Sequence, residues 1–154
     1  MVRQAGGNAR VEPIHLDDNS RKRVDLDLLM DNARSLVDVS IVHPTAKSHL
    51  PQAVTGQLAT AYKQARIKKV KYSEIAARNE APFIPFIMET YGGIIQEGTK
   101  LTSDIASFYE QHSLVGTGEW RNLSQEVMEG VAIALQRGNG LAARSCLYAP
   151  YASA

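Results

Sequence analysis

The stretch between residues 23 and 42 alternates polar and apolar side chains, and this pattern constrains the fold more than any other feature. Val24, Leu26, Leu28 and Met30 alternate with Arg23, Asp25, Asp27 and Leu29, and Val37, Val39 and Ile41 alternate with Asp38 and Ser40. A period of two residues is typical of a strand with one buried face. Residues 31–34, Asp-Asn-Ala-Arg, are typical of a turn, so the two runs predict an antiparallel hairpin.

A two-residue loop at residues 32–33 would set the register of this hairpin. Asp27 would then lie opposite Asp38, and Asp25 opposite Ser40, so that all four side chains share one face. A one-residue bulge would break this arrangement. Three carboxylates on one face repel each other unless a cation or basic side chains neutralise them. The alternative is that this face is only the solvated side of a half-exposed strand pair.

The rest of the chain predicts an α/β fold. We expect a short strand within residues 10–16, a long helix over 52–78, a strand buried on both faces over 81–90, and helices over 102–112 and 124–136. We expect Thr102 or Ser103 to cap the helix over 102–112. We expect Gly138-Asn139-Gly140 to end the helix over 124–136. A hairpin followed by a crossover helix and a buried strand predicts a mixed sheet.

The length of 154 residues corresponds to one domain. We divide it into a flexible N-terminus (1–9), a core (10–115), a C-terminal helical extension (116–147) and a frayed tail (148–154). A single cysteine excludes an internal disulfide, and the longest apolar stretch, residues 83–88, is too short to span a membrane. No secretory signal is recognisable at the N-terminus. These features predict an intracellular protein that does not contact a membrane.

The densest basic run lies in the expected long helix, at residues 66–72. Lys68, Lys71 and Tyr72 are spaced i, i+3 and i+4 and therefore form one patch, whereas Lys69 points elsewhere. A lysine in such a patch can orient a metal-bound water and stabilise charge on a reacting phosphate, and its neighbours can hold backbone phosphates. The alternative is a solvated helix surface.

Four stretches in this order resemble one known family. They are Arg-Val-Asp-Leu-Asp at residues 23–27, the segment at 36–46, Lys-x-x-Lys-Tyr at 68–72, and the segment at 83–92. Together they resemble the restriction-endonuclease-like domain at the C-terminal end of non-LTR (LINE-type) retrotransposon polyproteins, after the reverse transcriptase. Residues 131–139 resemble the C-terminal sequence of such polyproteins. The resemblance therefore covers about residues 10–147.

The resemblance implies a nuclease of the PD-(D/E)xK type. Asp25 and Asp38 match its two metal-binding acidic residues, with the backbone carbonyl of Val39 as a further ligand. The usual position of the lysine, two residues after the second acidic residue, is occupied by Ser40. In the retrotransposon branch the lysine comes instead from the following helix, which points to Lys68 or Lys71, with Tyr72 beside it. The implied catalytic residues are Asp25, Asp38, Lys68, Lys71 and Tyr72, and the implied DNA-binding residues are Arg23, Lys68, Lys71 and Tyr72.

The same resemblance implies hydrolysis of a DNA phosphodiester with Mg²⁺ or Mn²⁺. It also implies DNA as a partner, a reverse transcriptase domain if the chain belongs to a larger polyprotein, and a nuclear location in a eukaryote. Glu12 is a further candidate acidic partner. The rival hypothesis is an inactive retrotransposon remnant that binds DNA or is purely structural. A third hypothesis, a small helical interaction protein, fails if the hairpin of residues 23–42 forms.

Overall fold

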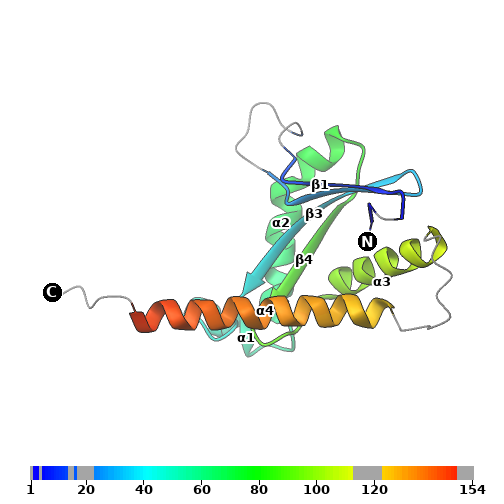
Figure 1. Cartoon of the computed structure of the whole chain (residues 1–154). Helices are drawn as coiled ribbons and strands as arrows, with labels where there is room; N and C mark the ends of the chain where they lie inside the picture. The colour runs from blue at the N-terminus through cyan, green and yellow to red at the C-terminus, as the bar shows by residue number, and fades with distance from the viewer. Residues whose placement is uncertain (1, 4, 14–15, 17–22, 113–122, 149–154) are drawn as a thin grey trace.

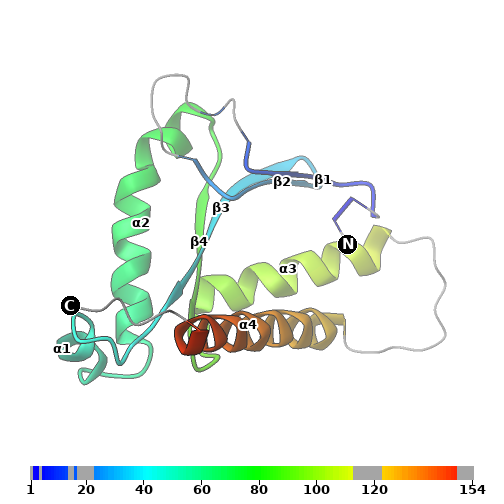
Figure 2. The same ribbon diagram turned by 60° about the vertical axis from the view of Figure 1, so that its left-hand side comes forward.

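The computed structural model describes residues 2–3, 5–13, 16, 23–112 and 123–148, which form an α/β fold. Its mixed sheet has the strand order β1-β2-β3-β4. The strands are β1 (Asn8–Val11), β2 (Leu26–Met30), β3 (Ala33–Val42) and β4 (Phe83–Glu89), and the helices are α1 (Leu50–Ala53), α2 (Ala59–Arg78), α3 (Gln96–His112) and α4 (Leu123–Tyr148). One face of the sheet packs against α2, and α3 and α4 lie on the other side (Figures 1 and 2).

The predicted hairpin is confirmed, because β2 and β3 pair antiparallel, but its predicted register is wrong by two residues. The two-residue loop is Asp31-Asn32, with φ values of 47° and 64°. Loops of this kind need positive φ at both central residues, a conformation that Asp and Asn adopt more readily than Ala. Asp27 consequently lies opposite Leu36 instead of Asp38. Because the shift is even, Asp27 still shares a face with Asp38 and Ser40. The prediction that Val24 lies on the face of Leu28 and Val37 is wrong, because Val24 packs with Leu36 and Tyr72 instead.

The ladder between β2 and β3 is irregular at its inner end. The strand β2 begins at Leu26, three residues later than predicted, and Leu26 is the partner of Val37. The backbone N–H of Asp25 also donates to the carbonyl of Val37, at 2.9 Å. Two residues of one strand therefore lie against one residue of the other, which is a β-bulge.

The buried strand is confirmed as β4, which pairs parallel with β3. Its proline, Pro85, is nearly inaccessible to solvent. The predicted long helix is divided into α1 and α2 by residues 54–58, where Leu58 adopts a φ of 57° and Gly56 a φ of 159°. The break separates a short N-terminal turn from the helix that makes the crossover, so only the second piece covers the sheet.

Four apolar clusters surround the sheet in the described part of the chain, and the smallest joins Val2 and Ala5 to Phe108 of α3. Two lie between the sheet and α2; their buried members are Val24, Leu36, Tyr72, Ile75 and Ala81 in one, and Val42, Ala61, Ala65, Ile87 and Ile95 in the other. The third lies on the opposite face, where Leu28, Val37, Phe86, Met88 and Leu101 are joined by partly buried side chains that include Val131 of α4. Each face of β3 therefore contributes to a different core layer.

The remaining boundaries differ from those predicted. The strand β1 begins at Asn8 and ends at Val11, instead of lying within residues 10–16. The helix α3 begins at Gln96, so Thr102 is not its cap; its hydroxyl donates to the carbonyl of Gly98 within the helix. The predicted boundary at residues 115–116 and the tail after Tyr148 lie outside the described residues. None of the helices in the described part of the chain combines the length and apolar character that a membrane span requires.

The helix α4 continues to Tyr148, so the predicted end at residues 138–140 is wrong. Packing outweighs the low helix propensity of the glycines here. Leu135 is buried, and the side-chain amide of Asn139 donates to the carbonyl of Thr90 at 2.8 Å. These contacts hold the helix on both sides of Gly138.

A glycine-to-alanine substitution tests this continuity. Gly138→Ala should raise the free energy of unfolding by about 0.5–1 kcal/mol, because alanine is the better helix former and its Cβ would meet no atom within 4 Å. Urea unfolding measures the change. Gly92→Ala is the matched control: Gly92 also has open space around a Cβ, but its φ of 97° should make alanine destabilising. A loss of stability in Gly138→Ala would contradict a continuous α4.

Candidate catalytic site

The sequence-predicted carboxylates, lysines and tyrosine meet between β3 and α2. On β3, the side chains of Leu36, Asp38, Ser40 and Val42 share the face that α2 covers. On α2, Lys68 lies between Ala65 and Tyr72 at the spacing of the buried helical stripe. Asp38 on β3 and Lys68 on α2 are thus each a charged residue within an apolar surface, and their side chains face each other.

Asp38 is the centre of a polar cluster that it forms with Lys68 and Ser40. It is only 3% exposed, and its Oδ2 lies 2.6 Å from the Nζ of Lys68, whose side chain is 16% exposed. The hydroxyl of Ser40 donates to the same oxygen at 3.2 Å. A buried carboxylate without such partners would be strongly destabilising, so Lys68 stabilises the charge that Asp38 brings into the core.

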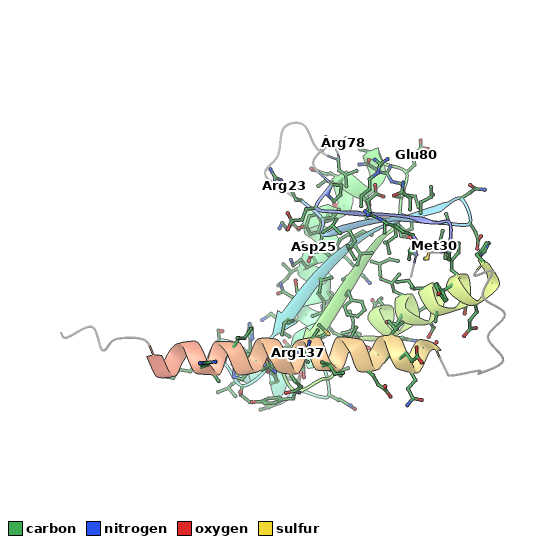
Figure 3. All side chains as sticks on the ribbon, viewed as in Figure 1. Arg23, Asp25, Met30, Arg78, Glu80 and Arg137 are labelled. Atoms are coloured by element: carbon green, nitrogen blue, oxygen red, sulfur yellow. The ribbon has the colours of Figure 1, made fainter. Side chains whose placement is uncertain are left out.

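The Asp25 carboxylate, at the bulge that precedes β2, lies against the backbone of Val39, the residue that follows Asp38. Its Oδ2 accepts a hydrogen bond of 2.6 Å from the backbone N–H of Val39. This N–H lies on the edge of β3 that β2 has left, and the carboxylate takes the place of the missing strand. The carbonyl of a strand residue points to the same edge as its N–H, so the Val39 carbonyl also points to this edge of β3. Figure 3 shows Arg23 and Asp25 at the end of the hairpin opposite Met30.

Tyr72 links the second lysine to the backbone of Arg23, two residues before Asp25. Its hydroxyl donates to the backbone carbonyl of Arg23 at 2.6 Å and accepts from the Nζ of Lys71 at 3.0 Å. The Lys71 ammonium also lies 4.7 Å from the centre of the Tyr72 ring. Burial raises the pKa of the Tyr72 phenol well above its ordinary value, and the nearby carboxylates of Asp38 and Asp25 raise that pKa further. The phenol therefore stays protonated as a hydrogen-bond donor.

The alternative of a purely solvated helix surface is wrong for Lys68 and Tyr72, because both are largely buried. Lys69 points away, as predicted, and its Nζ lies 2.7 Å from Glu97. Arg23 contributes its backbone carbonyl to the site, while the residue itself is exposed.

The expectation that three carboxylates converge is wrong. Asp27 is neutralised by Arg34, whose guanidinium lies 2.9 Å from it, because the shifted register removes Asp27 from Asp38. Glu12 also approaches the site only through its backbone, whose N–H donates to the carbonyl of Asp25 at 2.8 Å. Two carboxylates, not three or four, therefore define the site.

The donors that remain suit a small, hard divalent cation. Mg²⁺ is commonly held by one or two carboxylates and completes its shell with water and substrate oxygens. Asp25, Asp38 and the Val39 carbonyl supply such a set, although an ion would share Asp38 with Lys68. Within the described residues, no group of three or more His, Cys, Asp and Glu side chains is placed to hold a metal. A metal here would therefore depend on these two carboxylates, the carbonyl and water.

Sequence reasoning missed two features of this region. The bulge at Asp25 aims its carboxylate at the edge of β3, and no residue type in the sequence signals it. The pairing of Arg34 with Asp27 could have been found by choosing Asp31-Asn32 as the loop, which places the two side chains diagonally across the hairpin.

Comparison with known proteins leaves the family open. No protein-family model matches the chain, and no curated protein matches it. Any function must therefore be inferred from the geometry of the site.

The raised pKa of Tyr72 predicts a specific loss of stability in alkali. Below the ordinary tyrosine pKa of 10 the effect is absent; above it the unfolded chain ionises while the native phenol cannot, so the free energy of unfolding falls as pH rises, by at most about 1.4 kcal/mol per pH unit. Urea unfolding at about pH 9 and about pH 11 should therefore show a smaller alkaline loss in Tyr72→Phe than in the wild type.

Tyr62→Phe provides the matched control, since Tyr62 is a more exposed tyrosine of the same helix. This variant should keep the alkaline loss of the wild type. Equal alkaline losses in wild type and Tyr72→Phe would show that the Tyr72 phenol ionises as readily in the native as in the unfolded protein.

Proposed function

We propose that this chain is a metal-dependent endonuclease domain of retrotransposon origin that hydrolyses a DNA phosphodiester. The observation that carries the proposal is that the Asp25 carboxylate binds the edge of β3 at Val39, while the adjacent Asp38 pairs with Lys68 on the face that α2 covers. Their residue types and order along the chain match the motif of the PD-(D/E)xK nucleases that the sequence resembles. The four-stranded mixed sheet with a crossover helix is compatible with such a fold.

In this proposal Asp25, Asp38 and the Val39 carbonyl hold Mg²⁺ or Mn²⁺. When bound, the ion polarises the phosphoryl oxygen and lowers the pKa of a coordinated water. The bulge supports this role, since it fixes the Asp25 carboxylate against the backbone of Val39 before any substrate arrives. A preorganised ligand avoids the cost of rearranging it during the reaction.

The two candidate lysines differ in their surroundings. The Nζ of Lys68 lies on Asp38, where it can orient a water and stabilise negative charge on the phosphate oxygens. The Nζ of Lys71 lies on the Tyr72 hydroxyl and belongs to an exposed residue, which suits it to a backbone phosphate of the DNA. We therefore assign the catalytic role to Lys68 and a binding role to Lys71, with Tyr72 positioning Lys71 and Arg23 adding a cation at the surface.

The reverse transcriptase partner and the nuclear location are proposed from the sequence resemblance to retrotransposon polyproteins. A nick at a DNA target would expose a 3′ end for a reverse transcriptase domain carried by the same polyprotein, and such a domain would act in the nucleus of a eukaryote.

A second candidate is an inactive remnant that keeps the fold and binds DNA or serves a structural role. Two observations favour it. Ser40 stands where the motif usually has its lysine, and the hydroxyl is used to hold Asp38. Asp38 is also nearly inaccessible and already paired with Lys68, as a residual ion pair of a structural core would be.

Relaxation of supercoiled plasmid distinguishes the two candidates. With Mg²⁺ or Mn²⁺ present, the wild type should nick the plasmid, and Asp38→Asn and Asp25→Asn should each lower the rate by at least about a hundredfold, because an amide is a poor ligand for a hard cation. Asp25→Asn keeps an oxygen that can accept the Val39 hydrogen bond, so its fold should be preserved. Asp104→Asn, which removes an exposed carboxylate of α3, should nick at the wild-type rate.

Circular dichroism must show that each variant is folded. Nicking that requires metal and both aspartates supports the endonuclease. An absence of cutting by a folded wild type that still binds DNA in a salt-dependent way would favour the inactive remnant. Full activity in Asp38→Asn would contradict the assigned site.

A further inference from the structure

A pocket of about 270 Å³ lies on the sheet at β1, β2 and β3. It is separate from the polar cluster around Asp38. Its lining residues come from β1, β2 and β3: Asn8, Arg10, Asp27, Leu29 and Arg34. Arg10 lies opposite Asp27, and Asp27 lies opposite Leu36, which shares its face of β3 with Asp38. The pocket and Asp38 therefore occupy the same face of the sheet.

Arg34 is held in one orientation in this pocket. Its Nε lies 2.9 Å from Oδ1 of Asp27 and its Nη2 lies 3.1 Å from Oδ2. The Asp27 side chain is 9% exposed and that of Arg34 is 34% exposed. The hydrogen bond to Asp27, followed by the charge of that carboxylate, raises the pKa of Arg34, so the guanidinium remains charged. No hydrogen bond joins Nη1 to the part of the chain that the structure describes, which leaves this nitrogen for a ligand.

The charges of the pocket favour an anion. Both oxygens of Asp27 accept hydrogen bonds from Arg34, so the carboxylate is compensated within the pair. Arg10 then adds a second positive charge, from an exposed position without an ion pair to any described residue. One carboxylate and two guanidiniums leave the pocket with one excess positive charge. The planar donors of Arg and the amide of Asn8 are groups that bind phosphate oxygens.

We propose that Arg10 and Arg34 form a phosphate subsite for the DNA strand next to the position that is cut. This inference rests on the proposed function, because a DNA substrate at Asp25 and Asp38 supplies the phosphate. Asp27 follows Asp25 by two residues, with the bulge at Asp25, and Asp27 shares the face of the sheet that carries Asp38. The subsite therefore lies on the same face as Asp38, toward the loop of the hairpin, and Asp27 is a positioning residue for Arg34.

Binding without cutting tests the subsite independently of catalysis. Fluorescence anisotropy of a labelled DNA duplex is followed in Ca²⁺ over a series of salt concentrations. Arg10→Gln should weaken binding by about threefold to tenfold and reduce the slope of log K against log salt by about 0.9, the effect of losing one phosphate contact. Lys100→Gln is the matched control, because it removes the same charge from α3, on the other side of the sheet; it should bind as the wild type does.

A double variant tests the contribution of the Arg34 guanidinium at unchanged net charge. Asp27→Asn combined with Arg34→Gln leaves the net charge unchanged and keeps side chains that can hydrogen-bond to each other, and it should also weaken binding about threefold to tenfold. Wild-type affinity and salt slope in both variants would overturn the subsite, as would a wild type that binds no duplex. Displacement of the duplex by deoxythymidine monophosphate at micromolar concentration, lost in Arg10→Gln, would overturn it in favour of a free-nucleotide pocket.

The plasmid assay keeps this inference distinct from the proposed function. If Arg10→Gln weakens binding but the wild type cuts nothing, the subsite stands and the endonuclease fails. If the wild type cuts DNA and both variants bind it as the wild type does, the endonuclease stands and the subsite fails.

Discussion

Parallel strands cannot be joined by a tight turn, and in this protein that constraint decides where α2 must lie. Because β3 and β4 are parallel neighbours, the chain has to return across a face of the sheet between them. The crossover α2 buries Ala61, Ala65, Tyr72 and Ile75 against that face. The same packing fixes Lys68 over Asp38, so the polar pair inherits its geometry from the crossover.

The second requirement is a free edge on β3. In a regular ladder β2 would continue beside Val39 and cover it with backbone. The bulge at Asp25 ends that pairing, and the carboxylate replaces the missing strand as the partner of the Val39 N–H. One face of β3 is thus closed by α2 while its edge is left open beside two carboxylates. The charge of Asp38 is thus buried beneath α2, while the carboxylate of Asp25 lies at the open edge.

The sequence predicted the hairpin, the crossover helix and the buried strand, because each follows from local periodicity. It also predicted that Lys68, Lys71 and Tyr72 form one patch, since helical spacing alone decides this. The hairpin register was not predictable from spacing, because it depends on whether Asp31 and Asn32 or Asn32 and Ala33 adopt positive φ. The bulge, and the passage of α4 through Gly138, depend on tertiary contacts that local patterns do not contain. The nuclease resemblance and its metal stay predictions.

Paramagnetic broadening by Mn²⁺ tests most directly whether Asp25 and Asp38 form one metal site. In ¹H–¹⁵N spectra, substoichiometric Mn²⁺ should first broaden the amide resonances of Val39, Asp25 and their sequence neighbours. Asp25→Asn should remove this local effect while the rest of the spectrum is preserved. Broadening centred on other carboxylates, such as the hairpin loop at Asp31, or no broadening at Val39 in a folded protein, would contradict the account.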